Sequence, residues 1–187
     1  MTARLSYMPA HLRSLSTSDW AVLAFLSEGA VHGFKLAAIF AKGGELGTVW
    51  TLQRPQVYRA VQHLQARLYV SAVKREPGEN GPPRTLYALT ALGRATFETW
   101  LTTPVQHLRD GRSDLLLKLI FTERHKLDAK PLLRAQLEHF SEVLTAIQAK
   151  LENAQGPERT ALEWRIDAAR GALAFLERKL RLLSTLP

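Results

Sequence analysis

The 187-residue sequence contains no cysteine. This absence excludes disulfide bonds, thiolate nucleophiles and every zinc or iron–sulfur site that needs a cysteine ligand. Long apolar runs are also missing: no window approaches the roughly 18 uninterrupted apolar residues of a membrane span, and the first residues form no apolar signal-peptide core. We therefore expect a soluble, cytoplasmic protein with no membrane partner.

Catalytic motifs are missing as well. None of the six histidines pairs with another at the i, i+4 spacing of a helical zinc site. The glycine-rich motifs that bind dinucleotides or nucleoside triphosphates do not occur, nor does the Gly-x-Ser-x-Gly turn of a serine hydrolase. We therefore expect no enzymatic activity, no cofactor and no metal site.

Acidic residues are scarce in the middle of the chain. The formal net charge is +8, and 46% of the residues are apolar, as in a globular protein. Between residues 53 and 94 there are seven Lys or Arg and only two Glu, whereas the chain beyond residue 94 has 14 basic and 12 acidic residues. A concentrated positive segment is typical of a surface that binds nucleic acid. A solvated basic face without a ligand is the alternative.

Three helices are predicted before residue 68. Polar caps at residues 16–19 and a glycine at 29 bound the first helix, and glycines at 43 and 44 end the second. The third begins at Pro55, which suits a first helical position, and runs to about Arg67. Apolar residues recur along it with helical spacing and define its inner face: Val57, Ala60, Val61, Leu64 and Leu68.

The period then changes to that of a β-hairpin. Residues 70–75 and 84–89 alternate like two strands, and residues 76–83 between them contain three Pro and two Gly. Thr90 caps a fourth helix that extends to about Leu101. Three helices, a hairpin and a helix follow one another as in a winged helix-turn-helix domain, which we assign to residues 1–103. The predicted fold class is mainly α with a small β-wing.

Residues 104–187 are predicted to form a helical dimerisation domain. A short apolar helix over 114–121 precedes two long helices, which are separated by a break at 155–157. Apolar residues in both long helices recur alternately every four and three positions, the spacing of extended helix–helix contact. Because two such helices leave apolar surface uncovered, we expect a homodimer, with an intramolecular bundle as the alternative. The predicted interface residues are Leu162, Ile166, Leu173, Leu176, Leu180 and Leu183.

The third helix and the hairpin carry the candidate DNA-binding residues. A helix with a packed inner face presents its polar residues to base edges in the major groove, where Arg59 suits guanine and Gln56 suits adenine. The other candidates lie at the helix start, on its flank or in the hairpin, where phosphates are contacted: Gln53, Arg54, Tyr58, His63, Lys74, Arg75 and Arg84. For Tyr58 and His63, a half-buried structural role is the alternative.

Several segments occur in a characteristic order along the chain. They are Leu23 to Gly29, His32-Gly33-Phe34-Lys35-Leu36, Gln56-Val57-Tyr58-Arg59-Ala60-Val61 with Leu64, Tyr87-Ala88-Leu89-Thr90 with Gly93, Trp100-Leu101, and Asp114 to Leu119. Their order and spacing resemble the PadR family of bacterial transcriptional regulators, over the chain from about Leu15 onward. The resemblance implies a homodimeric repressor of the longer subfamily, whose C-terminal helices form the dimer. A dimer of this kind is expected to bind a pseudo-palindromic operator in double-stranded DNA.

The resemblance also implies a small effector, often aromatic, that releases the DNA. We expect Trp50 and Trp100, near element ends where the two domains meet, to stack on such a molecule, with burial in the core as the alternative. The sequence departs from the family at two places. Arg67-Leu68-Tyr69-Val70 lacks the glycine that usually follows the recognition helix, and Arg54-Pro55 stands where Ser or Thr often begins it.

These observations predict a sequence-specific DNA-binding transcriptional regulator. The second hypothesis is a dimeric winged-helix adaptor that binds proteins and lacks sequence-specific DNA binding. An adaptor has no reason to concentrate positive charge between residues 53 and 94. A salt-dependent affinity for DNA distinguishes the two hypotheses, because each neutralised phosphate releases counterions.

Overall fold

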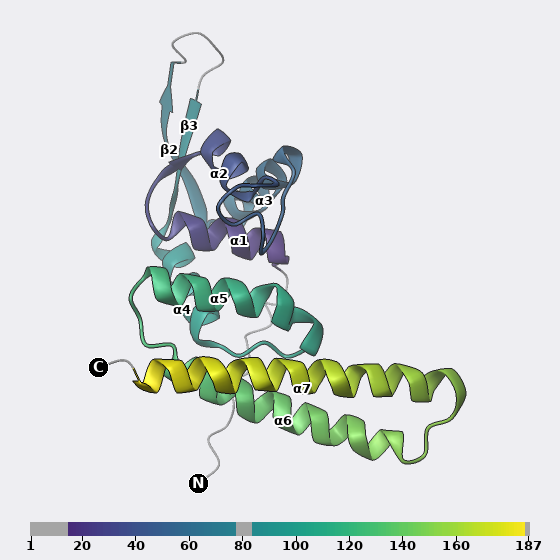
Figure 1. Cartoon of the computed structure of the whole chain (residues 1–187). Helices are drawn as coiled ribbons and strands as arrows, with labels where there is room; N and C mark the ends of the chain where they lie inside the picture. Colours follow the sequence, from purple (N-terminus) through teal and green to yellow (C-terminus); the bar gives the residue numbers. More distant parts are fainter. Residues whose placement is uncertain (1–14, 78–83, 186–187) are drawn as a thin grey trace. The chain divides into compact units, whose positions relative to one another are not determined.

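The computed structural model describes residues 15–77 and 84–185 (Figure 1). In chain order its elements are α1 (Thr17–Leu26), β1 (Val31–His32), α2 (Gly33–Phe40), α3 (Arg54–Ala66), β2 (Val70–Glu76), β3 (Arg84–Leu89), α4 (Ala91–Thr102), the 3-10 helix η2 (Leu108–Arg112), α5 (Asp114–Arg124), α6 (Lys130–Leu151) and α7 (Gly156–Thr185). This mainly helical order with a small antiparallel sheet confirms the predicted winged-helix fold class.

The described residues form two compact units. The winged-helix unit contains residues 15–103 together with Leu116–Lys126, and the helical unit contains Pro104–Leu115 and residues 127–185. Most of α5 therefore belongs to the same unit as the winged helix, because Leu117 and Phe121 join its hydrophobic core. None of the helices in the described ranges is long and apolar enough to cross a membrane.

The first helix, α1, occupies the centre of the winged-helix core. The Ser16 hydroxyl accepts a hydrogen bond from the N–H of Asp19 (3.2 Å), and the Asp19 carboxylate accepts one from the N–H of Ser16 (2.8 Å). This reciprocal pair satisfies two backbone donors at the helix start. Every residue from Asp19 to Leu26 is buried, because α1 packs against α3, α4 and β3.

The sheet has the strand order β1-β3-β2, and both neighbours of β3 run antiparallel to it. Val70 pairs with Leu89 at the base of the hairpin, and Glu76 pairs with Arg84 toward its tip. Between Ala72 and Lys74 the register shifts, so Val73 forms a β-bulge. The predicted hairpin is thus present, while residues 78–83 of its predicted tip lie outside the described residues.

The turn that follows α3 contains a residue with left-handed backbone, Leu68, whose φ is 60°. The Leu68 N–H donates to the carbonyl of Gln65 (2.9 Å), and the Tyr69 N–H donates to that of Leu64 (3.0 Å), which together make a Schellman motif. A side chain in this conformation costs about 1–2 kcal/mol relative to glycine. The missing family glycine therefore leaves strain at this turn.

Replacing Leu68 by glycine should stabilise the winged-helix unit. Leu68 is 69% exposed, so little apolar burial is lost, and the positive φ is relaxed. We expect the free energy of unfolding, measured by urea denaturation, to rise by about 0.5–1 kcal/mol. Leu68→Ala is the control, because it shortens the side chain but keeps the strained Cβ. Equal effects of Gly and Ala would contradict the assignment of strain to this residue.

A buried lysine links α5 to the end of α4. The Lys118 ammonium is fully buried and donates hydrogen bonds to the main-chain carbonyls of Trp100 and Thr103, the latter at 2.6 Å. The last carbonyls of a helix have no partner inside it, so Lys118 acts as a C-terminal cap for α4. Its ammonium also lies 4.6 Å from the centroid of the Trp100 indole, a cation–π contact.

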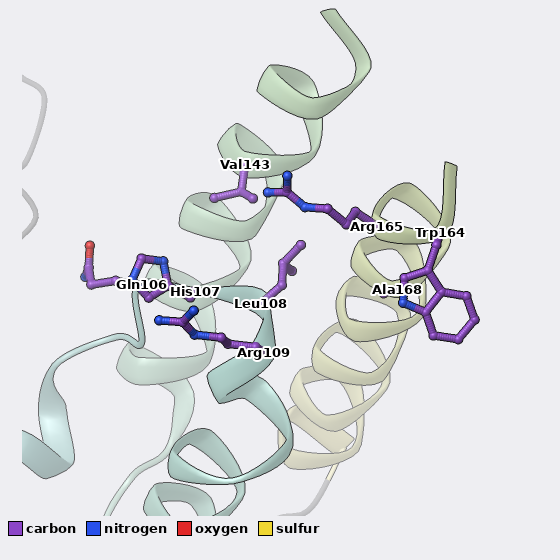
Figure 2. A pocket seen from close by; sticks show the side chains of 8 residues that line it. All are labelled: Gln106, His107, Leu108, Arg109, Val143, Trp164, Arg165 and Ala168. Carbon is purple, nitrogen blue, oxygen red and sulfur yellow. The ribbon is translucent and has the colours of Figure 1, made fainter. Parts of the chain in front are cut away.

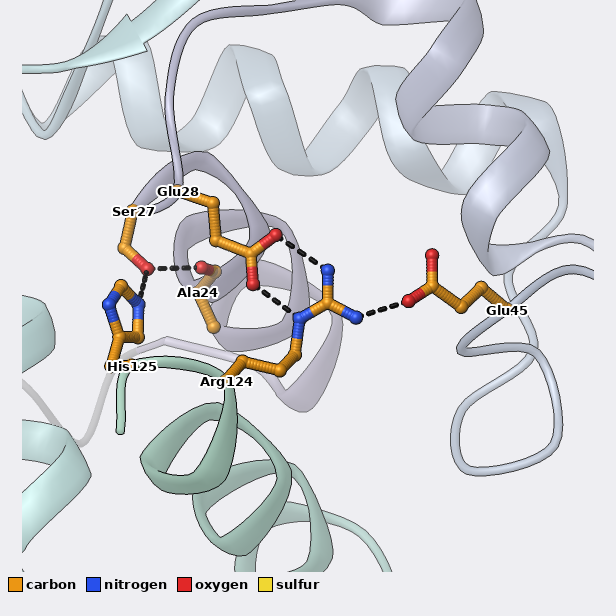
Figure 3. Close-up of polar contacts among 6 residues, drawn as sticks. All are labelled: Ala24, Ser27, Glu28, Glu45, Arg124 and His125. Carbon is orange, nitrogen blue, oxygen red and sulfur yellow. Dashed lines mark hydrogen bonds and ion pairs between the residues drawn. The ribbon is translucent and has the colours of Figure 1, made fainter. Parts of the chain in front are cut away.

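The end of α5 is held to the rest of the winged-helix unit by Arg124 (Figure 3). The guanidinium makes a bidentate pair with Glu28 after α1, with an Nη2–Oε2 distance of 2.6 Å, and a further hydrogen bond to Glu45 before α3. The hydrogen bonds from Glu28 and Glu45 raise the pKa of Arg124 above its usual range. Next to these ion pairs of Arg124, the Ser27 hydroxyl donates to the carbonyl of Ala24 (2.6 Å) and lies 2.7 Å from the His125 Nε2.

In the helical unit, α6 and α7 pack side by side with opposite directions (Figure 1). The apolar positions predicted from the sequence form their contact. Leu133, Phe140 and Ile147 of α6 are buried, as are Leu162, Ile166 and Leu176 of α7. The four-three spacing is therefore used for packing within one chain.

Candidate nucleic-acid interface

The recognition helix α3 separates a buried apolar face from an exposed polar one. Val57, Ala60, Val61 and Leu64 are buried as predicted, and they pack mainly on α1 and α2. The prediction that Leu68 shares this buried face is wrong, because the helix ends at Ala66 and Leu68 is exposed. The helix begins at Arg54, one residue before the predicted Pro55. Of the sequence candidates on α3 and directly before it, four are exposed: Gln53, Arg54, Gln56 and Arg59. In the described part of the chain the Arg59 guanidinium has no ion-pair partner, so it can bind a base or phosphate without breaking one.

The side chain of Gln56 already takes part in the start of the helix. Its Oε1 accepts a hydrogen bond from the N–H of Gln53 at 2.7 Å. This bond satisfies one of the backbone donors that a helix leaves unpaired at its N-terminus. Among residues 15–77 and 84–185 nothing accepts a hydrogen bond from the amide NH₂ group of Gln56, so the residue combines a structural contact with a donor that can bind DNA.

Two other candidates on α3 are held by contacts within the unit. The His63 Nδ1 lies 2.9 Å from the Asp19 carboxylate of α1, whose side chain is 5% exposed. The Tyr58 ring lies against the start of α2, because a Cβ built on Gly33 would approach its Cε1 to 2.9 Å. The Arg54 guanidinium stands 5.7 Å from the Tyr58 ring centroid. Tyr58 and His63 are therefore both half-buried, and each has a contact within the winged-helix unit.

The wing brings three predicted cations to its surface. Lys74 and Arg75 of β2 and Arg84 of β3 are all exposed. Lys74 pairs with Glu76 at 2.9 Å, and its hydrogen bond and charge lower the pKa of that carboxyl. Glu76 also lies 3.4 Å from the His32 Nε2. One acid among several cations leaves this surface positive.

The structure adds Phe34 to this surface, which sequence reasoning did not single out. Phe34 is 49% exposed in the first turn of α2, and the Arg84 guanidinium lies 5.3 Å from its ring centroid. Its ring also stacks near His32, at a centroid distance of 5.8 Å. Phe34 is two residues from the buried Leu36, which places it on the opposite side of the helix. The two-residue spacing between Phe34 and Leu36 was the sequence feature that could have predicted the exposure of Phe34.

Residues 22–99, which include α3 and the wing, match the model of the transcriptional regulator PadR-like family. Over this segment the chain is similar to the PadR-like family. The family is one of transcriptional regulators, in agreement with the expectation that the protein is not an enzyme.

Known proteins with similar sequence or structure span different shares of the chain. A probable transcriptional regulator of Mycobacterium tuberculosis, Rv1176c, is 31% identical over 97 residues, which are 51% of this chain and 49% of that protein. The chain thus matches about half the length of this curated relative. Bacillus subtilis PadR in complex with operator DNA has a TM-score of 0.46 at 19% identity, covering 89% of this chain and 99% of that one. The same protein in complex with p-coumaric acid has a TM-score of 0.40 at 20% identity, covering 95% and 99%.

The two tryptophans expected to bind an effector both contact other side chains of the winged-helix unit. Trp100 is 0% exposed and stacks on Trp20, with ring centroids 5.0 Å apart and an interplanar angle of 9°. Lys118 lies over the same indole, so the Trp100 ring has no open face here. Trp50 is half-buried, and its Nε1 donates to the Ser18 hydroxyl at 3.3 Å.

A pocket of about 580 Å³ lies in the helical unit, and neither Trp50 nor Trp100 is among the residues that line it. It is lined by Gln106, His107, Leu108, Arg109, Val143, Trp164, Arg165 and Ala168. Figure 2 shows Leu108 between the side chains of Arg109 and Arg165, with Arg165 reaching toward Val143 and the Trp164 ring on the outer side of α7. An apolar floor with cations at its edge is suited to an anion that has an apolar body.

The predicted dimer residues lie along the contact between α6 and α7. Leu162, Ile166 and Leu176 are buried there, and the remaining three, Leu173, Leu180 and Leu183, are half-buried. Packing within the chain thus already accounts for the burial of the first three.

Among the described residues, no three His, Asp or Glu side chains gather as metal ligands.

Proposed function

We propose that this protein is a sequence-specific DNA-binding transcriptional regulator. The observation that carries the proposal is the exposed face of α3, where Arg54, Gln56 and Arg59 stand over a fully packed apolar face. A helix presented in this way enters the major groove, while a wing with exposed cations follows the phosphate backbone. The family match over residues 22–99 supports the same reading.

Each residue has a role that fits its geometry. Arg59 is proposed to pair with guanine, and the free NH₂ group of Gln56 to donate to an acceptor on a base edge. Gln53, Arg54 and the Tyr58 hydroxyl, at the helix start and flank, are proposed to contact phosphates. His63 is proposed to position α3 through its bond to Asp19 rather than to contact DNA.

The wing cations Lys74, Arg75 and Arg84 are proposed to contact phosphates without reading sequence. Arg84 is held over the Phe34 ring, which limits the positions of its guanidinium. Such contacts set the register of the protein on the duplex and supply most of the salt-dependent affinity.

The proposal includes a homodimer that acts as a repressor. A two-fold dimer places two α3 helices on half-sites whose centres lie about one helical turn of DNA apart, or a multiple of it, so the operator is a pseudo-palindrome. The resemblance to PadR regulators supports repression. Release by a small effector completes the proposal, because a ligand that binds one arrangement of the subunits better shifts the half-site spacing.

The pocket beside η2 supports an effector with an acid group and an apolar body. Arg109 and Arg165 supply positive charge, while Leu108 and Val143 supply apolar contact. An aromatic carboxylate such as p-coumaric acid, the ligand in one of the compared structures, is the first probe. Its addition to a complex with operator DNA is expected to release the DNA.

Binding of the purified protein to DNA from upstream of its own gene, compared with random DNA over a salt series, tests the function. A preference for the upstream DNA is expected, with log affinity falling by about 0.9 per neutralised phosphate for each tenfold rise in salt. Equal, weak binding to both DNAs, with an operator search over the genome also negative, would overturn the proposal and favour the adaptor hypothesis.

Two alanine variants separate base reading from phosphate contact. Arg59→Ala is expected to weaken operator binding by about 1–3 kcal/mol and to relax the preference at one base pair. Lys74→Ala is expected to weaken operator and random DNA alike and to reduce the salt slope by about one. Fluorescence anisotropy with a set of single-base operator variants measures both effects. If Arg59→Ala weakens random DNA as much as operator, its assignment to a base is wrong.

A further inference from the structure

The β-bulge in β2 decides which polar side chains share a face of the sheet. Cross-strand partners in an antiparallel sheet lie on the same face, and side chains alternate between faces along a strand. His32 and Lys74 both pair with Leu86, and Glu76 lies two positions beyond Lys74, so these polar residues share one face. In an unbroken register Val73 would pair with Leu86 instead. Lys74 and Glu76 would then lie on the other face, which packs on the hydrophobic core.

Glu76 has a different partner at each carboxylate oxygen. Its Oε1 lies 2.9 Å from the Lys74 Nζ, and its Oε2 lies 3.4 Å from the His32 Nε2. The hydrogen bond and the charge of Lys74 do most to lower the pKa of Glu76, with smaller effects from His32 and Arg84. The carboxylate is therefore ionised at neutral pH and holds the Lys74 ammonium. A phosphate that binds Lys74 has to compete with this ion pair.

We propose that His32 is a positioning residue of the DNA-binding wing: its imidazolium pairs with Glu76 in place of Lys74, so that the Lys74 ammonium can bind a phosphate. The inference rests on the proposed function, in which Lys74 contacts the DNA backbone. The exchange is balanced in charge, because one cation replaces another at the carboxylate. The proton on His32 comes from the solvent, so DNA binding and proton binding favour each other.

Ionisable side chains on four elements surround His32. They are Glu76 and Lys74 of β2, Arg84 of β3, Lys35 of α2, and Tyr58 of α3, whose ring lies against Gly33. Glu76 is the one acid among these five residues. A proton on His32 therefore has a single carboxylate to pair with, while the nearby cations oppose it. Phosphates that neutralise those cations remove this repulsion and favour the imidazolium.

The imidazole ring is placed so that Nε2 is the nitrogen that meets the acid. The ring lies 5.8 Å from the Phe34 ring centroid, with an interplanar angle of 19°. Its Nδ1 is buried and has no hydrogen-bond partner within residues 15–77 and 84–185. A proton on Nδ1 therefore has no acceptor, and this cost must be offset by negative charge near the ring. Glu76 without Lys74, beside bound phosphates, supplies that charge.

The pH dependence of binding to a random duplex tests the exchange. Histidine changes its charge between pH 5 and pH 8. At constant ionic strength, we expect fluorescence anisotropy to give an affinity about three- to tenfold higher at pH 6 than at pH 8. His32→Gln should bind at both pH values about as weakly as the wild type at pH 8. His125→Gln makes the same substitution outside α3 and the wing, and this control should keep the wild-type pH dependence.

Two substitutions of surface side chains decide the question even where His32→Gln does not fold. Glu76→Gln removes the competitor for Lys74, so its affinity at pH 8 should reach at least that of the wild type at pH 6. Lys74→Ala should lose most of the pH dependence, because His32 acts through Lys74. A Lys74→Ala variant with the full wild-type pH dependence would show that His32 acts on DNA directly, and would overturn the inference.

The outcomes separate this inference from the proposed function. Measurable binding with equal affinity at pH 6 and pH 8 would overturn the inference and leave the DNA-binding proposal intact. The same holds for a pH dependence that is lost in His63→Gln and kept in His32→Gln, which would assign it to the histidine on α3. A wild type that binds no DNA at either pH would overturn the proposed function, and the inference with it.

Discussion

Trp100→Ala should lower the free energy of unfolding of the winged-helix unit by about 3–5 kcal/mol. The indole is 0% exposed and stacks on Trp20 at 5.0 Å. Its removal leaves a cavity in the core and takes away the ring on which the buried Lys118 ammonium rests. Both losses act on the same place, where α4 meets α1 and α5.

Two further variants serve as controls. One tests the effect of losing any tryptophan, and the other tests the contribution of the indole N–H. Trp164→Ala removes an exposed indole and should change stability by no more than about 0.5 kcal/mol. Trp100→Phe should cost much less than Trp100→Ala, because the buried Trp100 Nε1 has no hydrogen-bond partner in the described part of the chain. Urea denaturation followed by far-UV circular dichroism measures all three. Similar losses for Trp100→Ala and Trp164→Ala would show that the Trp100 packing described above is wrong.

The helix α3 shows how much of a structure the spacing of apolar residues can predict. The inner residues Val57, Ala60, Val61 and Leu64 were predicted and are buried, because a helix turns its side chains by a fixed angle and its apolar residues mark one face. The exposure of Arg59 follows from the same geometry. Local pattern alone thus yields the two faces of the helix.

Contacts between distant residues could not be predicted in this way. His63 is bound by Asp19, 44 residues earlier in the chain, and no local pattern links the two. Lysine is usually found at the surface, yet Lys118 is buried because backbone carbonyls at the end of α4 accept hydrogen bonds from its ammonium. These partners depend on how elements pack, so the fold was predictable while the contacts of His63 and Lys118 were not.

The long C-terminal helices show a different limit. The four-three spacing predicted extended helix contact, but spacing does not say whether the partner belongs to the same chain. The strongest apolar seam, with Leu162, Ile166 and Leu176, is used within the chain. Only the structure separated the two faces of α7.

Gly93→Ala should destabilise the winged-helix unit by about 3 kcal/mol, although alanine is the better helix former. Gly93 lies in the first turn of α4, where its N–H donates to the Thr90 hydroxyl at 3.0 Å. A Cβ at this position would lie 2.0 Å from the carbonyl oxygen of Tyr69 and 2.8 Å from its carbon. These are backbone atoms, and the Tyr69 carbonyl is itself held by the N–H of Thr90 at 3.0 Å. The clash can be relieved only if α4 moves away from the start of β2.

Gly171→Ala is the matched control for this prediction, because it makes the same change inside a helix at a position with open space. It should stabilise the chain by about 0.5–1 kcal/mol, the ordinary gain of alanine over glycine. The two substitutions are thus expected to have opposite signs in urea denaturation at the same low protein concentration. Gly93→Ala should also weaken DNA binding, because β2 starts the wing that carries Lys74 and Arg75. A Gly93→Ala variant as stable as the wild type would mean that α4 and β2 are not in this close contact.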